Sequence, residues 1–211
     1  SDYSRLNPFP GAIAGRVVNT SGEPDMGAPA DLAFLPAYVN DEAVRYRADL
    51  VSGPQPAENM GIGLLIAEGE GYMGHDPRAA MGSYRAALRI SPDDRDLWSR
   101  LASAILAVNS SDYSERARLQ RDGSAAALNA YRLTRSRGER AASLAQLAVA
   151  LDRRDLYRPA IESYKASLEL TNSAEVRAAY DDLRARKGFR VIEHSVDADT
   201  ASPRVCIQFS E

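Results

Sequence analysis

The chain lacks several features that define large classes of protein. Its 211 residues include one cysteine, Cys206, which excludes an intramolecular disulfide framework and a zinc site built from several thiolates. No apolar run approaches the roughly 18 residues that a membrane-spanning helix requires. The net charge is −3 and the basic residues do not cluster, so neither nucleic acid nor a membrane surface is predicted as a partner. Aromatic residues make up only 7% of this alanine-rich chain, which favours closely packed helices over a β-sandwich.

Three regions follow from the distribution of prolines, glycines and apolar residues. Residues 1–35 contain prolines and glycines too often for a long helix or strand, so we predict an irregular arm or linker. Residues 36–187 have the apolar spacing of helices, and residues 188–211 alternate as strands do. The predicted helices cover residues 36–51, 57–74, 77–90, 94–109, 112–135, 138–153, 156–170 and 173–187, and the predicted strands cover 189–194 and 204–209.

The helical region contains an internal repeat. A small residue and a tyrosine four positions later recur in three of the predicted helices: Ala80 and Tyr84, Ala127 and Tyr131, Ala160 and Tyr164. The helix before each of them carries large and small residues in a common order, namely Leu64 and Ala67, then Trp98, Leu101 and Ala102, then Leu144, Leu147 and Ala148. This pattern resembles the tetratricopeptide repeat, a pair of antiparallel helices of about 34 residues in which small side chains let the helix axes approach.

The resemblance implies a mainly α fold of stacked helical pairs over residues 62–92, 98–134 and 144–170. The first pair carries Glu68 and Gly71 where the repeat has a small residue and an aromatic one, so looser packing is expected there. The second pair has about thirteen extra residues, which predicts a longer helix over 112–135. Its charged residues are expected to form a solvated face: Glu115, Arg116, Arg118, Arg121 and Asp122.

A competing interpretation concerns Gly69, Gly71 and Gly74, which follow the apolar residues 62–67 with the spacing Gly-x-Gly-x-x-Gly. Between a strand and a helix, this spacing is a dinucleotide-binding fingerprint. Two glutamates flank the place where a pyrophosphate would lie, and like charges at about 4 Å cost roughly 4 kcal/mol. The next predicted helix starts beyond the glycines, where Asp76 caps Pro77. We therefore favour an ordinary helix that its glycines loosen.

Few other residues are candidates for chemistry. His75 and His194 lie far apart in the sequence, with no cysteine or acid near them at ligand spacing, so surface or satisfied histidines are predicted. Asp197 and Asp199 lack the remaining pattern of a calcium-binding loop. No serine or cysteine stands in a recognisable nucleophile elbow. We predict no catalytic site, no metal and no cofactor, and therefore no enzyme.

The tetratricopeptide resemblance also implies where a partner would bind, because protein segments occupy a groove lined by the first helix of each pair. Carried over by repeat position, the groove residues are Ile62, Leu65, Tyr72, Met73, Ser99, Ser103, Val149, Asp152 and Arg153. Leu65, Ser99 and Ala145 stand where some family members carry the basic and asparagine residues that clamp a C-terminal carboxylate, so that activity is not expected. Alternatively, the groove residues pack against neighbouring segments of the same protein.

The end of the chain resembles a second family. Residues 188–199 and 201–211, which read GFRVIEHSVDAD and ASPRVCIQFSE, are similar to the start of the first β-domain in large proteobacterial alpha-2-macroglobulin-like proteins. In those proteins a helical repeat region precedes that domain, and segments at 118–122, 129–132 and 158–164 resemble it. The resemblance implies a protease trap of the periplasm or cell envelope, of which this chain is an N-terminal fragment. No Cys-x-Glu-Gln thioester motif is present.

These observations predict a non-catalytic helical-repeat scaffold of an alpha-2-macroglobulin-like endopeptidase inhibitor. Its expected partners are proteins: other domains of the same large chain or a protein of the cell envelope. A free-standing peptide-binding adaptor is the first alternative, and a dinucleotide-binding protein is the remote one.

Overall fold

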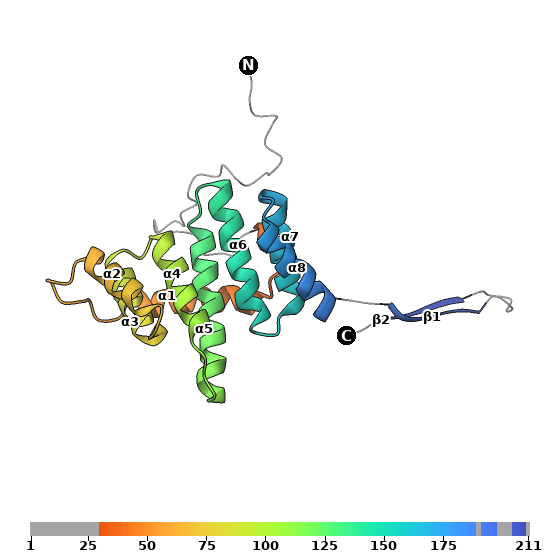
Figure 1. Cartoon of the computed structure of the whole chain (residues 1–211), viewed down its shortest axis with the longest axis horizontal. Helices are drawn as coiled ribbons and strands as arrows, with labels where there is room; N and C mark the ends of the chain where they lie inside the picture. Colours follow the sequence, from red (N-terminus) through yellow and green to blue (C-terminus); the bar gives the residue numbers. More distant parts are fainter. Residues whose placement is uncertain (1–29, 189–190, 198–203, 210–211) are drawn as a thin grey trace, which may run out of the picture.

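In the computed structural model the chain is mainly α-helical (Figure 1). The structure describes residues 30–188, 191–197 and 204–209, and most of the predicted arm lies outside this part of the chain. A 3₁₀ helix, η2 (Ala30–Leu32), precedes α1 (Ala37–Val51), α2 (Ile62–Tyr72), α3 (Pro77–Ile90), α4 (Arg95–Ala107), α5 (Tyr113–Arg132), α6 (Arg137–Asp152), α7 (Tyr157–Leu170) and α8 (Ala174–Lys187). Two strands follow, β1 (Val191–Asp197) and β2 (Arg204–Phe209), and they pair antiparallel with Val196 opposite Val205.

The helices from α2 to α8 form a row in which each helix packs against the next one along the chain. Short loops join them, so neighbours run antiparallel. Helix α1 does not belong to this row: it packs across α5 and also contacts α3. Figure 1 shows α1 crossing behind the row. Leu32, with 2% of its surface exposed, packs into the same core, so the core begins within the last residues of the predicted arm.

Side-chain caps start many of these helices. The Asp76 carboxylate accepts the N–H of Ala79 at 3.0 Å, and Pro77 follows in the first turn, which confirms the start predicted there. Asp94, Asp112 and Ser173 cap α4, α5 and α8 in the same way. A capping box opens α6, in which Ser136 and Glu139 each accept a backbone N–H of the other. Local polar residues therefore set the starts of α3, α4, α5, α6 and α8.

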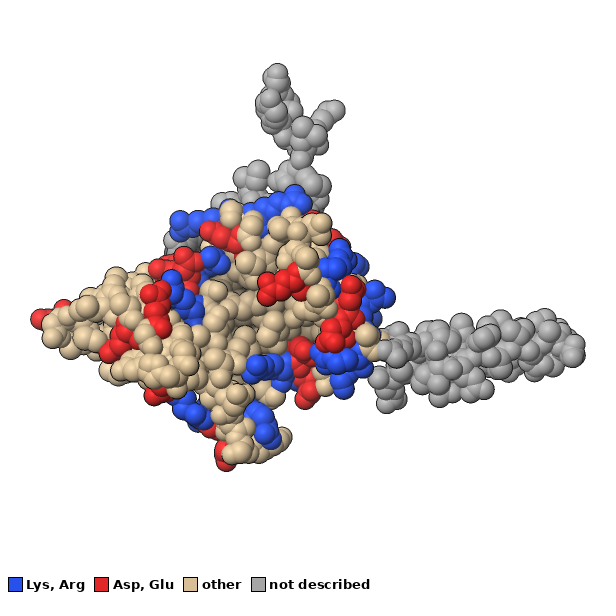
Figure 2. All heavy atoms as spheres, viewed as in Figure 1, with Lys and Arg blue, Asp and Glu red and all other residues tan. Residues whose placement is uncertain are grey.

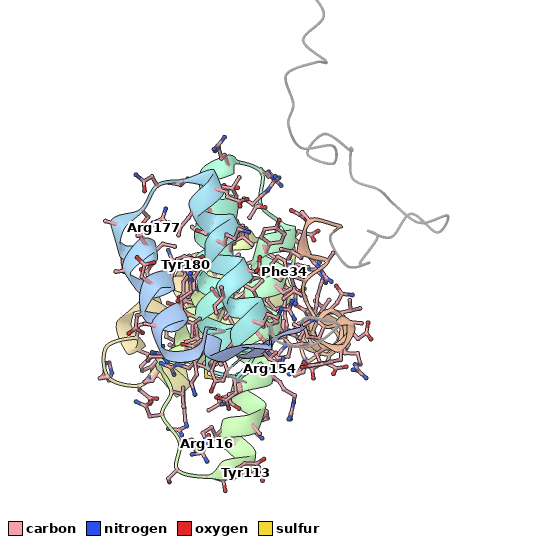
Figure 3. All side chains as sticks on the ribbon, turned by 90° about the vertical axis from the view of Figure 1, so that its right-hand side faces the viewer. Phe34, Tyr113, Arg116, Arg154, Arg177 and Tyr180 are labelled. Atoms are coloured by element: carbon pink, nitrogen blue, oxygen red, sulfur yellow. The ribbon has the colours of Figure 1, made fainter. Side chains whose placement is uncertain are left out.

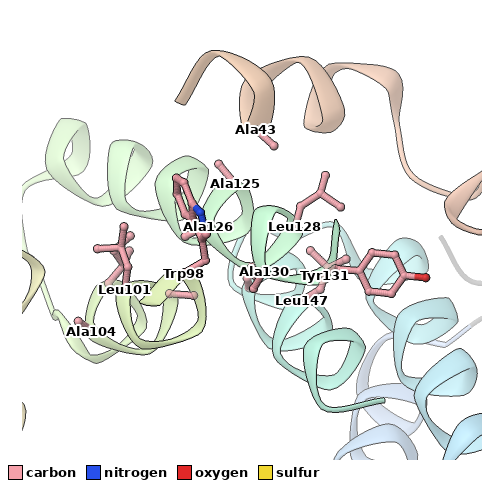
Figure 4. Close-up of a cluster of buried hydrophobic side chains, with 14 of the residues drawn as sticks. Ala43, Trp98, Leu101, Ala104, Ala125, Ala126, Leu128, Ala130, Tyr131 and Leu147 are labelled. Atoms are coloured by element: carbon pink, nitrogen blue, oxygen red, sulfur yellow. The ribbon is translucent and has the colours of Figure 1, made fainter. Parts of the chain in front are cut away.

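The recurring alanines and tyrosines are buried in the second helix of each pair. Ala80, Ala127 and Ala160 have no exposed surface, and the exposed fractions of Tyr84, Tyr131 and Tyr164 are 1%, 5% and 5%. Figure 4 shows the middle of the core, where small side chains of α5 face three other helices. Ala125 faces Ala43 of α1, and Ala130 lies beside Leu147 of α6. The small residues allow the helix axes to approach closely, as the repeat pattern predicts.

The predicted register of the first pair is wrong. Leu64, matched to the buried Leu144, is 62% exposed, whereas Leu65 is 3% exposed and lies in the core. The turn between the paired helices is not the reason, because it has four residues in the first pair and in the third. Helix α2 packs mainly on α3, whereas α6 packs on α4, α5 and α7. The face of α2 that carries Leu64 therefore has no neighbouring helix to cover it.

The packing of α2 is loose at Gly71, as expected, but it is tight at the neighbouring Gly69. A Cβ atom on Gly69 would lie 2.5 Å from Cε1 of Tyr84, so the tyrosine ring occupies the place of a side chain. Glu68 accepts a hydrogen bond from the Ser83 hydroxyl at 2.8 Å, which ties α2 to α3 again. A Cβ atom on Gly71, by contrast, would have no neighbour within 4 Å. Gly69 therefore allows the Tyr84 ring of α3 to approach the backbone of α2, whereas Gly71 has no such role.

The prediction that the charged residues of α5 form one solvated face is wrong for Glu115 and Asp122. Arg116, Arg118 and Arg121 are exposed as expected. Asp122 instead lies against α3, where its carboxylate pairs with Arg85 at 3.3 Å, and burial raises the pKa of this carboxyl. Glu115 likewise turns to α3 and pairs with Arg78 at 3.0 Å. Both acids therefore join α5 to α3.

Polar contacts fix α1 across α5. The buried Asn129 side chain donates to the Ala43 carbonyl at 3.0 Å. The Arg85 guanidinium, besides pairing with Asp122, donates to the Tyr46 hydroxyl at 3.2 Å. The Tyr46 ring in turn packs edge-on against Trp98, with 6.1 Å between centroids. These contacts supply partners for polar groups that would otherwise be buried unsatisfied.

Substitution of the two glycines tests the packing of α2. Gly69→Ala is expected to lower the free energy of unfolding by about 1–3 kcal/mol, because the buried Tyr84 ring has to move. Gly71→Ala is the matched control, and it is expected to raise this free energy by about 0.5–1 kcal/mol, because alanine favours the helix. Urea denaturation measures both. Equal effects of the two substitutions would contradict the close approach at Gly69.

The capping box of α6 predicts a pH-dependent contribution to stability. The backbone N–H groups of Arg135 and Ser136 donate to the Glu139 carboxylate and lower the pKa of that carboxyl below its usual value. A depressed carboxyl pKa stabilises the fold above the unfolded pKa, and this contribution is lost as pH falls through the folded value. Glu139→Gln should therefore lower the Tm at pH 7, and the difference from the wild type should vanish as pH falls through the lowered pKa of Glu139.

Ser136→Ala serves as the comparison, because it removes a neutral cap. It should cost about 1 kcal/mol both at pH 7 and in acid. A Tm difference for Glu139→Gln that persists unchanged in acid would show that the charge on Glu139 does not stabilise α6.

Candidate functional site

A polar network joins α4 and α6 on the side where the groove was predicted. The Ser99 hydroxyl donates to Oε1 of Gln146 at 3.0 Å. The Gln146 amide donates to the Ser99 carbonyl and to the Ser103 hydroxyl, both at 2.9 Å. Val149 follows Gln146 by one helical turn and is 38% exposed, and Arg153 follows one turn later and is also exposed. Four of the predicted groove residues therefore share one surface: Ser99, Ser103, Val149 and Arg153.

Ion pairs continue this surface to the flanking helices. Arg100 of α4 pairs with Glu70 of α2 at 2.5 Å. Asp152 of α6, another predicted groove residue, pairs with Arg186 of α8 at 3.4 Å. These charges neutralise one another, and small uncharged side chains with the exposed Val149 lie between them. We call this surface the α2–α4–α6 face: Glu70, Ser99, Arg100, Ser103, Gln146, Val149 and Arg153.

The groove residues predicted on α2 do not belong to this face. Leu65 is part of the core, and Ile62, Tyr72 and Met73 are partly buried against it. These four residues face the core, whereas the exposed residue of α2 that reaches α4 is Glu70, which pairs with Arg100. Sequence reasoning also missed Gln146, which the repeat pattern leaves variable and which nothing in the local sequence distinguishes.

The charged side chains do not point to a binding site on the face of the molecule that Figure 2 shows. In the view of Figure 2, acidic and basic side chains are interspersed, without a broad area of one sign. Within the described residues no group of three or more histidine, cysteine and acidic side chains is placed to hold a metal ion. His75 is exposed, with its ring centroid 5.8 Å from that of Tyr72. His194 lies in β1 and Cys206 in β2, and the structure describes only the backbone of these two strands.

The glycine motif has no dinucleotide-binding geometry. Helix α2 runs from Ile62 to Tyr72 and includes Gly69 and Gly71, whereas the fingerprint needs a strand before its glycines and a helix starting among them. Gly69 packs against Tyr84 within the core. The helical interpretation of these glycines is therefore the one that the structure supports.

A pocket of about 980 Å³ lies away from the α2–α4–α6 face, between the start of α7 and the end of α8. Leu156, Tyr157 and Ile161 supply apolar walls, and Arg184 and Lys187 lie on the α8 side. The Lys187 ammonium sits 4.6 Å from the centroid of the Tyr157 ring. None of the predicted groove residues lines this pocket.

The model contains no membrane-spanning helix among the described residues, since none of its helices combines the necessary length with the necessary apolar character. Comparison with protein-family models gives no match for the chain. A search of curated proteins finds no significant relative.

Proposed function

We propose that this chain is a non-catalytic helical-repeat module that holds a protein segment against its α2–α4–α6 face. The observation that supports this most is the exposed Val149, which lies beside the hydrogen-bonded network of Ser99, Ser103 and Gln146. An apolar residue between satisfied polar groups offers contact area to a partner without a cost in unpaired donors. Glu70 and Arg100 neutralise each other at one end of the face, which limits electrostatic specificity there.

The repeat class that we propose is tetratricopeptide-like. Support comes from the buried alanines and tyrosines, which occupy corresponding places in α3, α5 and α7. It also comes from the packing of each helix on its successor. The long α5 and the crossing helix α1 are departures from a simple stack of pairs.

We further propose that the module belongs to an alpha-2-macroglobulin-like protease inhibitor of the periplasm or cell envelope. This part rests on the resemblance of residues 188–211 to the start of a macroglobulin β-domain. The antiparallel pairing of β1 with β2 supports it, because an isolated two-stranded ribbon is marginally stable and gains from further strands. In that setting the module would position the inhibitory domains or recruit an envelope partner.

Photo-crosslinking in the host cell tests the proposal on the full natural protein. With a photoreactive amino acid in place of Val149, we expect a crosslinked peptide that mass spectrometry can identify. A peptide from β-domains of the same polypeptide supports the scaffold of an inhibitor, and a peptide from another protein supports an adaptor. Either result requires that the α2–α4–α6 face is covered by protein.

The matched control carries the photoreactive residue in place of Ala48, which is exposed on α1 on another side of the molecule. This position should not give the same crosslink. Absence of any crosslink from position 149, or an identical product from position 48, would contradict a binding role for the face. A full-length protein without β-domains after residue 211 would contradict the inhibitor assignment.

A further inference from the structure

The first turns of α5 form an exposed projection that the proposed function does not use. Helix α5 has 20 residues, against 13 in α4 and 16 in α6. Figure 1 shows its lower end extending beyond the neighbouring helices, and Figure 3 places Tyr113 and Arg116 at this end. Tyr113 is 76% exposed, the largest value among the exposed large hydrophobic residues of the described chain. Its ring adds nothing to the core.

This projection is held rigidly. Asp112 caps the helix by accepting the Glu115 N–H at 2.6 Å. The Glu115 carboxylate accepts two hydrogen bonds from Arg78 of α3, at 3.0 and 3.2 Å, and one from the Ser110 hydroxyl at 2.5 Å. Arg78 and Ser110 together lower the pKa of the Glu115 carboxyl. The backbone that carries Tyr113 is therefore anchored to α3.

Arg116 orders the exposed ring further. Its guanidinium lies 5.9 Å from the centroid of the Tyr113 ring and donates to the Ser110 carbonyl at 3.4 Å. An aromatic ring and a guanidinium that are already ordered lose little conformational entropy when a partner binds. Tyrosine and arginine are also among the residues that contribute most at protein interfaces.

The projection is electropositive although the chain as a whole is acidic. Of its three acids, Glu115 pairs with Arg78 and Asp122 pairs with Arg85, whereas Asp112 caps the helix. The exposed cations Arg116, Arg118 and Arg121 form no ion pair within the described residues. The same is true of Arg153, whose carbonyl accepts a hydrogen bond from Gln120 of α5. We call this set the α5 tip: Tyr113, Arg116, Arg118, Arg121 and Arg153.

We propose that the α5 tip docks onto an acidic surface of a partner protein, with Tyr113 seated in a shallow apolar depression among carboxylates. The exposed arginines favour an acidic partner because their charge is complementary to carboxylates. The ordered ring of Tyr113 favours a protein surface, where an aromatic side chain can be buried. A nucleic acid would require a longer basic stripe than these few arginines provide, and the net charge of the chain opposes it. The α5 tip shares Arg153 with the α2–α4–α6 face, but the argument from Tyr113 and Arg116 does not depend on that face.

Fluorescence anisotropy with a defined probe tests the proposal on the full chain. The probe is a fluorescein-labelled peptide of glutamates interrupted by single leucines. We expect it to bind, and we expect Tyr113→Ala and Arg116→Glu each to raise its Kd about tenfold. Binding should weaken as salt is added, because exposed charges contribute. Circular dichroism and the Tm should stay unchanged, since neither side chain is part of the core.

Tyr38→Ala is the matched control, because Tyr38 is 47% exposed on α1 and also lies under a guanidinium, that of Arg154 at 5.7 Å. Arg154 differs in being paired with Glu42 at 2.8 Å, so this site carries no free positive charge. Tyr38→Ala should therefore leave the Kd of the peptide unchanged. Three results would each overturn the proposal: no binding of the peptide at low salt, equal binding of a lysine version, or insensitivity to the tip substitutions. Tighter binding of duplex DNA or of phosphatidylglycerol vesicles would overturn it in favour of a different class of partner.

Discussion

The burial of the second half of α5 on all of its sides is the constraint on which the rest of the molecule depends. Nine consecutive residues, from Gly123 to Tyr131, are buried. A helix can be buried over consecutive positions only when other elements surround it, and here α1, α4 and α6 do so. Glycine, serine and alanine supply most of this segment, so three neighbours can approach one axis. The row of helical pairs and the crossing helix α1 meet at this point.

Such burial would be costly if the polar groups within it had no partners. Asn129 donates to a carbonyl of α1, and the Ser124 hydroxyl accepts a hydrogen bond from the guanidinium of Arg154 at 2.8 Å. The Tyr131 hydroxyl donates a hydrogen bond to the Asp31 carboxylate. The pKa of Tyr131 is raised mainly by burial and further by this hydrogen bond. Each contact reaches a different neighbouring segment. Polar groups of α5 therefore select the positions of α1 and η2, while its alanines allow the close contact.

The fold could be predicted where local signals act, and less well where distances between elements decide. Helix starts such as that at Asp76 follow from cap chemistry, and the burial of Tyr84, Tyr131 and Tyr164 follows from their recurrence. The face of α2 could not be predicted by repetition, because α2 packs mainly on α3 and lacks the further neighbours that α6 has. The crossing of α1 over α5 depends on long-range contacts, such as that of Asn129, which no local pattern encodes. The candidate face was predicted on α4 and α6 and missed on α2 for the same reason.

Native-state hydrogen exchange of the full chain tests the central role of α5 most directly. If three surrounding helices hold this segment, the backbone amides of Ala127–Tyr131 can exchange only when the whole domain unfolds. Their opening free energy should then equal the global free energy of unfolding, while amides of α8, where Leu183 is the one buried side chain, exchange through smaller local openings. Exchange of the α5 amides at the rate of the α8 amides, in a domain of normal global stability, would contradict this account.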